Sequence, residues 1–112
     1  MPSGVALIDT YYRRGWLSPG KFAAASGFLR DIAATSASRG KPDSRVAALK
    51  RLACAKDRLS AEQLSVLMAL SLDDEAPGSW ARMNGMVERK GLALLRAALE
   101  RLVPLYVTDG TE

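Results

Sequence analysis

Cationic and small side chains alternate along residues 87–103 in a pattern that suits contact with a phosphate backbone. Projected at about 100° per residue, this segment carries cations on both edges of its outer face and alanines between them. The edge residues are Arg89 and Arg96 on one side and Lys90 and Arg101 on the other, with Ala93 and Ala97 between. Small side chains permit close approach and cations neutralise phosphate charge, so this face could lie against a nucleic-acid strand. Arg82, a few residues upstream, is a further candidate contact.

The same pattern also fits an ordinary solvated helix face. Glu88 and Glu100 place negative charge among the cations. Glu100 follows Arg96 by four residues, a spacing at which the two side chains can pair on a helix.

A second group of cations lies in the first half of the chain. Residues 1–58 hold eleven Lys and Arg against four Asp and Glu, while residues 59–112 hold five against eight. On the helix expected to end near Arg58, Lys50, Arg51 and Arg58 share one face, and Arg45 adds a cation near its start. The other side of this helix carries Val46, Leu49, Leu52 and Ala53. A one-sided cationic face is typical of nucleic-acid binders, although unrelated solvated helices share it.

The residue inventory argues against catalysis and against metal binding. The chain has no histidine and a single cysteine, Cys54, so the commonest general base and a thiolate zinc site are both missing. We therefore expect no enzyme, no cofactor and no metal. Cys54 is interpreted as a small residue at the edge of the packing. Trp16 and Trp80 are few and far apart, which favours core anchors over a base-stacking platform.

Length and apolar content predict a single folded domain over residues 1–112. The composition, 48% hydrophobic and 25% charged, is that of a globular protein. No apolar run approaches the roughly 20 residues of a membrane helix, and Met1–Asp9 lacks the plan of a secretory signal. A cytoplasmic protein with no membrane contact is expected, in which residues 1–15 are loosely attached and residues 106–112 form a tail.

Apolar residues recur at three- and four-residue spacing nearly everywhere, which predicts an all-α bundle of five to six helices. A short helix over Val5–Arg14 should stop at Gly15. Ser18 and Pro19 should start a second, running to about Ser36 with an apolar stripe of Phe22, Ala25, Leu29 and Ile32. A third, capped by Asp43 or Ser44, should end near Arg58. Ser60 and Gln63 form a capping box for a fourth, which carries Leu64, Leu67, Met68 and Leu70.

The last two helices have the outline of a helix-turn-helix in the C-terminal half. A short helix should follow Ser79, Gly85 should supply the turn, and Ala81, four residues earlier, should let the helices approach. The final helix should cover Val87–Val103 and end at Pro104. Its apolar face is expected in the core: Val87, Gly91, Leu94, Leu95, Ala98 and Leu102. Two ordinary bundle helices joined at a glycine would give the same outline.

Three stretches of the chain together resemble a known family. They are FLRDIAATSASRG, LSAEQLSVLMALSLDDEAPGSWARM and GMVERKGLALLRAALERLVPLY, covering most of Phe22–Tyr106. They resemble the helical DNA-binding domain of alphaproteobacterial gene-transfer-agent activators and related phage proteins, and the later helices resemble the promoter-binding helix-turn-helix of sigma factors. The chain departs from those activators at Leu105 and Val107, where they tend to have histidine and glycine. The resemblance implies transcriptional control, with Arg89, Lys90 and Arg96 as DNA contacts.

The sequence thus predicts a small phage- or gene-transfer-type regulator that contacts duplex DNA phosphates with a basic helical face. One alternative is a protein-interaction bundle, an inhibitor or adaptor of a host complex such as RNA polymerase. Another is a small terminase-like DNA-packaging subunit. The sequence leaves the oligomeric state and the choice between activator, repressor and inhibitor open.

Overall fold

The computed structural model describes residues 5–36 and 42–107, and all the regular structure in these ranges is helical. The helices are α1 (Val5–Arg13), α2 (Pro19–Ser36), α3 (Pro42–Arg58), α4 (Ala61–Asp73), α5 (Pro77–Met83) and α6 (Glu88–Tyr106). The predicted all-α bundle is therefore confirmed. None of the described helices has the length and apolarity needed to cross a membrane.

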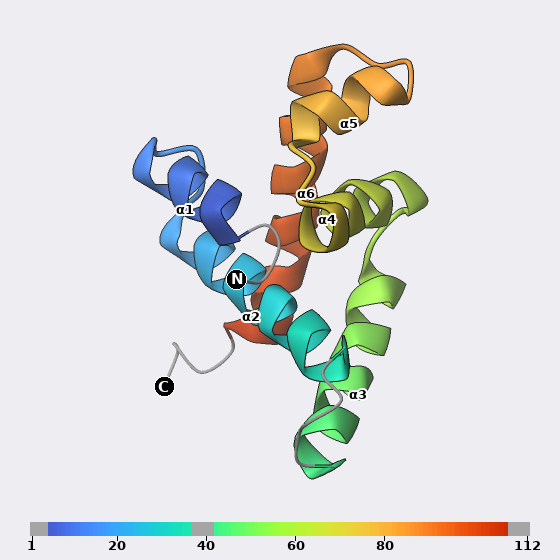
Figure 1. The fold of residues 1–112 in the computed structure, drawn as a ribbon. Helices are drawn as coiled ribbons and strands as arrows, with labels where there is room; N and C mark the ends of the chain where they lie inside the picture. Colours follow the sequence, from blue (N-terminus) through green and yellow to red (C-terminus); the bar gives the residue numbers. More distant parts are fainter. Residues whose placement is uncertain (1–4, 37–41, 108–112) are drawn as a thin grey trace.

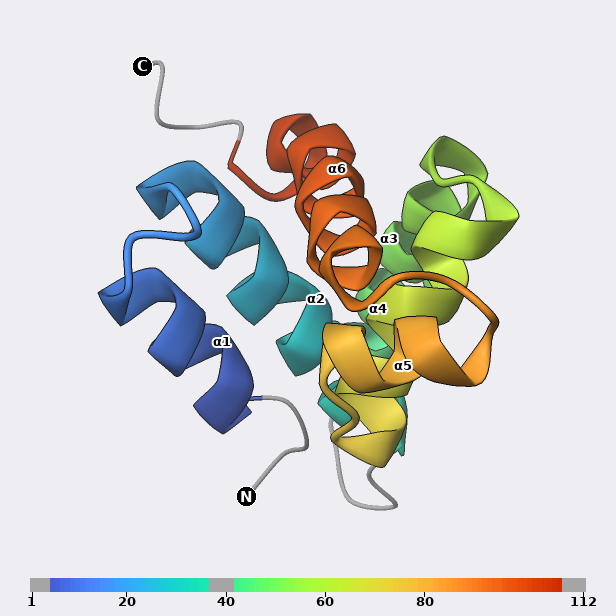
Figure 2. The same cartoon turned by 90° about the horizontal axis from the view of Figure 1, so that it is seen from above.

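The long C-terminal helix α6 is the centre of the bundle. Helices α2, α4 and α5 pack directly on it, α3 packs on α2 and α6, and α1 packs on α2. Figure 1 shows α5 lying across one end of α6 and α3 lying toward the other end, and Figure 2 shows α6 between α2 on one side and α3 on the other. This arrangement places the N-terminal turns of α6 beside α5 and away from α3.

The core forms where the apolar stripes of these helices meet. Its largest fully buried side chains include Phe28 of α2, Leu67 and Leu70 of α4, and Leu95, Leu99 and Leu102 of α6. Burying each such side chain contributes about 1.5–3 kcal/mol relative to exposure. Of the stripe predicted for α2, Ala25 and Leu29 are buried, while Phe22 and Ile32 are half-buried. Ile8 and Tyr11 join α1 to the same cluster.

Side-chain caps start two helices where the sequence predicts them. The backbone N–H of Lys21 donates to Ser18 Oγ at 3.2 Å, so Ser18 caps α2. At α4, the Gln63 N–H donates to Ser60 Oγ at 3.1 Å and the Ser60 N–H donates to Gln63 Oε1 at 3.0 Å. The predicted capping box is confirmed. The capping side chains proposed for α3, Asp43 and Ser44, lie outside the described side chains.

The start of α5 and the end of α6, each near a proline, differ from the sequence prediction. Helix α5 begins at Pro77 rather than after Ser79, because proline lacks an N–H and has the φ angle of the first helical position. Helix α6 does not end at Pro104 but continues to Tyr106. Pro104 is exposed. We attribute the continuation to the packing of the next residues, since Leu105 and Tyr106 are anchored against the core.

Helix α3 is rotated relative to the sequence prediction. Its packing face consists of Ala48, Leu52 and Ala55, which are all buried. Val46 and Leu49, which were expected on the apolar side, are 50% and 51% exposed, and Ala53 is exposed as well. An alanine seam allows α3 to approach α2 closely, and the larger aliphatic side chains then remain on the solvent side.

Candidate nucleic-acid interface

The junction between α5 and α6 is a tight turn that glycine makes possible. Gly85 has φ +76°, in the left-handed region that favours glycine. Its N–H donates to the Arg82 carbonyl at 3.2 Å, and the Met86 N–H donates to the Ala81 carbonyl at 2.8 Å. These two bonds form the Schellman motif that ends many helices. The turn residue predicted from the sequence is thus confirmed.

Small residues let α5 and α6 pack closely. Ala81 is fully buried, as its spacing from Gly85 predicts. Gly91 of α6 makes an even closer approach, because a Cβ at this position would overlap the carbonyl group of Pro77. The helical repeat predicts Gly91 in the core but does not reveal this backbone contact. The relative position of α5 and α6 is therefore fixed by backbone packing.

The outer face of α6 next to this junction carries the predicted cations. Arg82, Arg89, Lys90 and Arg96 are exposed, and so are the alanines between them, Ala93 and Ala97. We call these six residues the α5–α6 basic face. Arg82 forms an ion pair with Glu88, Nη1 to Oε2 3.3 Å, with both side chains about two-thirds exposed. Within the described part of the chain, no ion pair involves Arg89, Lys90 or Arg96.

Two details of α6 differ from the sequence prediction. Val87 was expected in the core, but it is the residue before the first turn of α6 and is 62% exposed. Glu100 was expected to pair with Arg96, yet its ion pair is with Lys21 of α2, Nζ to Oε1 3.5 Å. Arg96 is left facing solvent, because α2 supplies a cation on the other side of Glu100.

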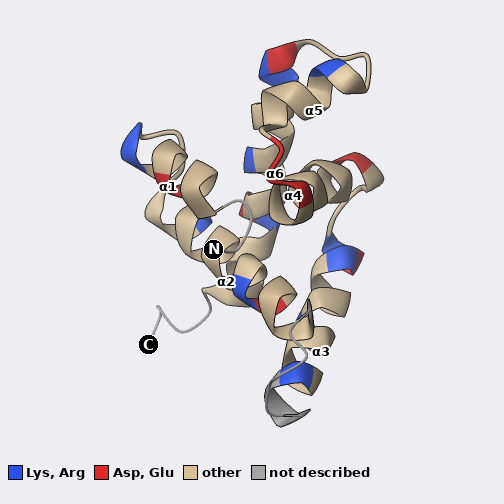
Figure 3. Cartoon of the chain, viewed as in Figure 1, with Lys and Arg blue, Asp and Glu red and all other residues tan. Residues whose placement is uncertain are grey.

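The cations of α3 do not join the α5–α6 basic face. Figure 3 shows Lys and Arg at the α1–α2 turn, around the α5–α6 end and along α3, as separate groups. Arg45, Lys50 and Arg58 are exposed. The end of α3 meets the C-terminal half of α6, where Arg101 Nη1 donates to the Arg58 carbonyl at 2.9 Å. Arg101 lies twelve residues after Arg89, or about 18 Å along the helix axis.

Arg51 takes part in a structural cluster, which makes it a weaker candidate for a nucleic-acid contact than the other cations of α3. Its guanidinium donates two bonds to the buried carboxylate of Asp31, Nε to Oδ2 at 2.9 Å and Nη2 to Oδ1 at 2.8 Å. The hydroxyl of Tyr106 donates to Oδ2 of the same carboxylate at 2.7 Å. This cluster joins α2, α3 and α6, so the Arg51 charge is already neutralised by Asp31.

The Asp31 cluster also changes the ionisation of its members. Burial, and then the hydrogen bond to Asp31, raises the pKa of Tyr106 strongly. The hydrogen bond to Asp31 raises the pKa of Arg51. The sequence analysis did not identify this cluster. Its one available signal was an acidic residue between Leu29 and Ile32 on the apolar stripe of α2, since a buried carboxylate requires a partner.

No family model, curated protein or solved structure matches this chain. The function therefore has to be argued from the residues themselves. Among the described residues, no three His, Cys, Asp or Glu side chains gather in a way that could hold a metal ion. Cys54 is exposed and unbridged.

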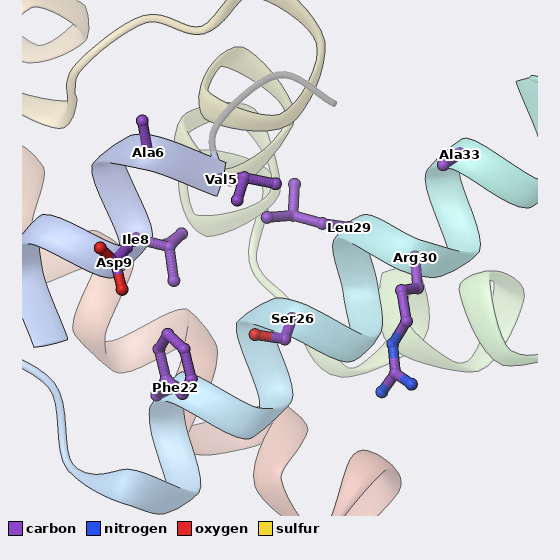
Figure 4. Close-up of a pocket in the computed structure, with 9 residues that line it drawn as sticks. All are labelled: Val5, Ala6, Ile8, Asp9, Phe22, Ser26, Leu29, Arg30 and Ala33. Atoms are coloured by element: carbon purple, nitrogen blue, oxygen red, sulfur yellow. The ribbon is translucent and has the colours of Figure 1, made fainter. Parts of the chain in front are cut away.

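An apolar cavity of about 450 Å³ lies between α1 and α2. Figure 4 shows Val5 and Leu29 pointing toward one another near Ile8 and Phe22, while Arg30 extends away from α1. Binding sites for small ligands combine apolar walls with a few convergent polar groups. The polar side chains around this cavity, including Arg30, do not converge, so it is a weaker candidate site than the α5–α6 basic face.

The two tryptophans have different environments. Trp80 is 5% exposed and its indole N–H donates to Ser65 Oγ at 3.0 Å, which confirms it as a core anchor. Trp16 is 38% exposed, so the prediction that it is a core anchor is wrong. Its ring stacks on Tyr11 with centroids 5.4 Å apart, and the Arg14 guanidinium carbon lies 5.2 Å from its centroid.

Proposed function

We propose that the protein binds duplex DNA through the α5–α6 basic face, as a transcriptional regulator of the phage or gene-transfer type. The observation that carries the proposal is the set of cations Arg89, Lys90 and Arg96, which form no ion pair among the described residues and flank exposed Ala93 and Ala97. Cations that are free to meet phosphates on either side of a smooth strip match the surface of a helix that docks on DNA.

The junction with α5 supports the same proposal. In helix-turn-helix proteins the first helix crosses the backbone and the second enters the major groove with its N-terminal residues. Here α5 is fixed against α6 by the Gly85 turn and the Gly91 contact, and the α6 part of the basic face begins in the first turn of that helix, at Arg89. The exposed side chains of Met83 and Val87 lie at the same end and could contact thymine methyl groups.

The salt dependence of binding tests the proposal. Three phosphate contacts, from the cations without an ion pair, Arg89, Lys90 and Arg96, predict that log K falls against log salt with a slope of about −2.7 per bound copy. We expect Arg89→Ala and Arg96→Ala each to reduce this slope by about one. Lys50→Ala on α3 removes an equal charge elsewhere and should leave the slope unchanged. The measurement is fluorescence anisotropy of a labelled random-sequence duplex at several salt concentrations.

Two results would contradict the duplex-binding proposal. One is a folded wild-type protein that does not bind duplex DNA even at low salt. The other is a folded Arg89→Ala, Arg96→Ala double variant with unchanged affinity and slope. The regulatory role has a separate test, because a regulator prefers its specific site over random DNA by about 10³-fold or more. Selection from a random duplex pool should enrich one sequence, and equal recovery of all sequences would contradict regulation.

The alternative of a protein-interaction bundle is favoured by one feature, a groove where α2, α3 and α4 meet. It is lined by Ile32, Leu49, Met68 and Leu72, and Leu49 and Leu72 are each about half exposed. Lys56 lines the same groove, so a fitting protein partner would present apolar side chains beside carboxylates. A stable protein complex that Leu49→Asp abolishes, together with no duplex binding at low salt, would favour this alternative.

A terminase-like packaging subunit would combine DNA binding with a ring of several copies. The mass of the protein in solution distinguishes it from a monomeric or dimeric regulator.

A further inference from the structure

A second basic feature, a cleft, lies between the α1–α2 turn and the α5–α6 end of the bundle. It encloses about 430 Å³, within the roughly 300–1,000 Å³ of small-molecule sites. Its walls include Arg14 and Trp16 from the turn, Arg82 from α5, and Glu88 and Arg89 from α6. We call it the arginine cleft. The sequence pattern does not reveal the cleft, because its two walls are sixty or more residues apart in the chain.

The charges of the arginine cleft favour an anion. Three guanidinium groups from three different elements line it, against one carboxylate, Glu88, which pairs with Arg82. No ion pair in the described ranges involves Arg14 or Arg89. Arginine is suited to phosphate because its planar donors match two phosphate oxygens at once. Two of the three cations of the cleft therefore have no carboxylate partner among the described residues.

The aromatic side of the cleft is held in a defined position. Gly15, with φ +78°, allows the Trp16 N–H to donate to the Tyr11 carbonyl at 2.9 Å and the Gly15 N–H to donate to the Tyr12 carbonyl at 3.0 Å. This second Schellman motif brings the Trp16 ring onto Tyr11, the contact such motifs often include. The Arg14 guanidinium carbon lies over the Trp16 ring, 5.2 Å from its centroid, and both side chains line the cleft. Guanidinium planes and aromatic rings both stack on nucleobases.

We propose that the arginine cleft binds an unpaired nucleotide of a DNA strand. Its base stacks on the Arg14 guanidinium that lies over Trp16, and its phosphate contacts Arg89. The cleft and the α5–α6 basic face share Arg82 and Arg89, so a strand leaving a duplex on that face can enter the cleft directly. This inference rests on the proposed function, because the ligand of the cleft is part of a bound DNA strand.

The test compares a blunt DNA duplex with the same duplex carrying a single-stranded thymidine overhang, using the full chain. Stacking of one base contributes about 1–3 kcal/mol, so the overhang duplex should bind about 5- to 150-fold more tightly. It should also quench tryptophan fluorescence, because Trp80 is buried and Trp16 is exposed. Trp16→Phe keeps an aromatic ring and should retain the tighter binding while losing the quenching.

Arg14→Gln and Arg13→Gln form a matched pair of variants. They remove the same charge from adjacent residues, but Arg13 pairs with Asp9 and is not part of the cleft lining. Arg14→Gln should lower the affinity for the overhang duplex at least fivefold, and Arg13→Gln should not. Neither side chain belongs to the core, so both variants should fold.

The outcomes separate this inference from the proposed function. Equal binding of both duplexes without quenching overturns the inference and leaves duplex binding intact. Tighter binding of the overhang that Arg14→Gln does not change also overturns it. Binding of the overhang strand without any binding of the blunt duplex supports the cleft and contradicts the proposed function. No binding of either probe contradicts both.

Discussion

The packing of α5 on α6 predicts a large effect of a single methyl group at Gly91. In Gly91→Ala the added Cβ would overlap the carbonyl carbon and oxygen of Pro77 and lie 3.2 Å from Ala81 Cβ. The overlapped atoms are backbone, so no side-chain rotation relieves the clash and α5 must move. Overpacking of this kind costs about 1–3 kcal/mol. Because the overlap is with backbone atoms, the cost lies at the upper end of this range, about 3 kcal/mol. Replacing a helical glycine by alanine returns about 1 kcal/mol, so we expect the free energy of unfolding to fall by about 2 kcal/mol.

Gly20→Ala is the matched control, since it makes the same substitution in another helix. A Cβ at Gly20 would lie 3.8 Å from the methyl groups of Val103, an ordinary contact. Gly20 is near the start of α2, so this variant should gain stability of up to about 1 kcal/mol. Urea unfolding followed by circular dichroism measures both. The reasoning is refuted if Gly91→Ala is as stable as the wild type or as Gly20→Ala.

Three further predictions concern side chains that hold the bundle together. Tyr106 has a raised pKa in the folded protein, so its contribution to stability is complete below about pH 10 and is lost as the pH rises further. Above pH 10, urea unfolding should show a smaller decrease in the free energy of unfolding for Tyr106→Phe than for the wild type. Equal decreases would contradict this prediction. Ser60→Ala should lower the free energy of unfolding by about 1 kcal/mol, because it removes a cap; an unchanged urea midpoint would argue against the capping box. Arg51→Ala should destabilise the protein by about 2 kcal/mol, less than for a fully buried ion pair because the Arg51 side chain is 45% exposed. The same substitution at the neighbouring Lys50 should cost under about 0.5 kcal/mol. Equal losses of stability in thermal unfolding would be incompatible with a stabilising pair between Arg51 and Asp31.

The sequence predicts those parts of the fold that depend on neighbouring residues. The caps at Ser18 and Ser60 and the turns at Gly15 and Gly85 are set by bonds within a few residues, and each occurs where expected. The exposure of Arg89, Lys90 and Arg96 follows from the helical repeat in the same way. The capped starts of α2 and α4, the two glycine turns and the outer face of α6 therefore follow from the sequence, whereas the start of α5 and the end of α6 do not.

The features that the sequence does not predict depend on contacts between distant residues. The rotation of α3 results from the close fit of Ala48 and Ala55, whereas a pattern search favours the larger Val46 and Leu49 for the core. The role of Arg51 depends on Asp31, twenty residues away and on another helix.

Trp16 shows the same limit at the candidate site. Its contact with Tyr11 is local, but its exposure depends on which helices cover the α1–α2 turn. Helices α5 and α6 approach that turn without covering it. The open space between the turn and these two helices is the arginine cleft.

An NMR titration of the labelled protein with a short duplex at low salt tests most directly whether the α5–α6 basic face is the DNA-binding surface. We expect the largest amide shift changes in the segment 82–97, with smaller ones at the α1–α2 turn, and little change along α3. Changes confined to α3 and α4, or a spectrum that the duplex does not alter, would contradict the proposed function.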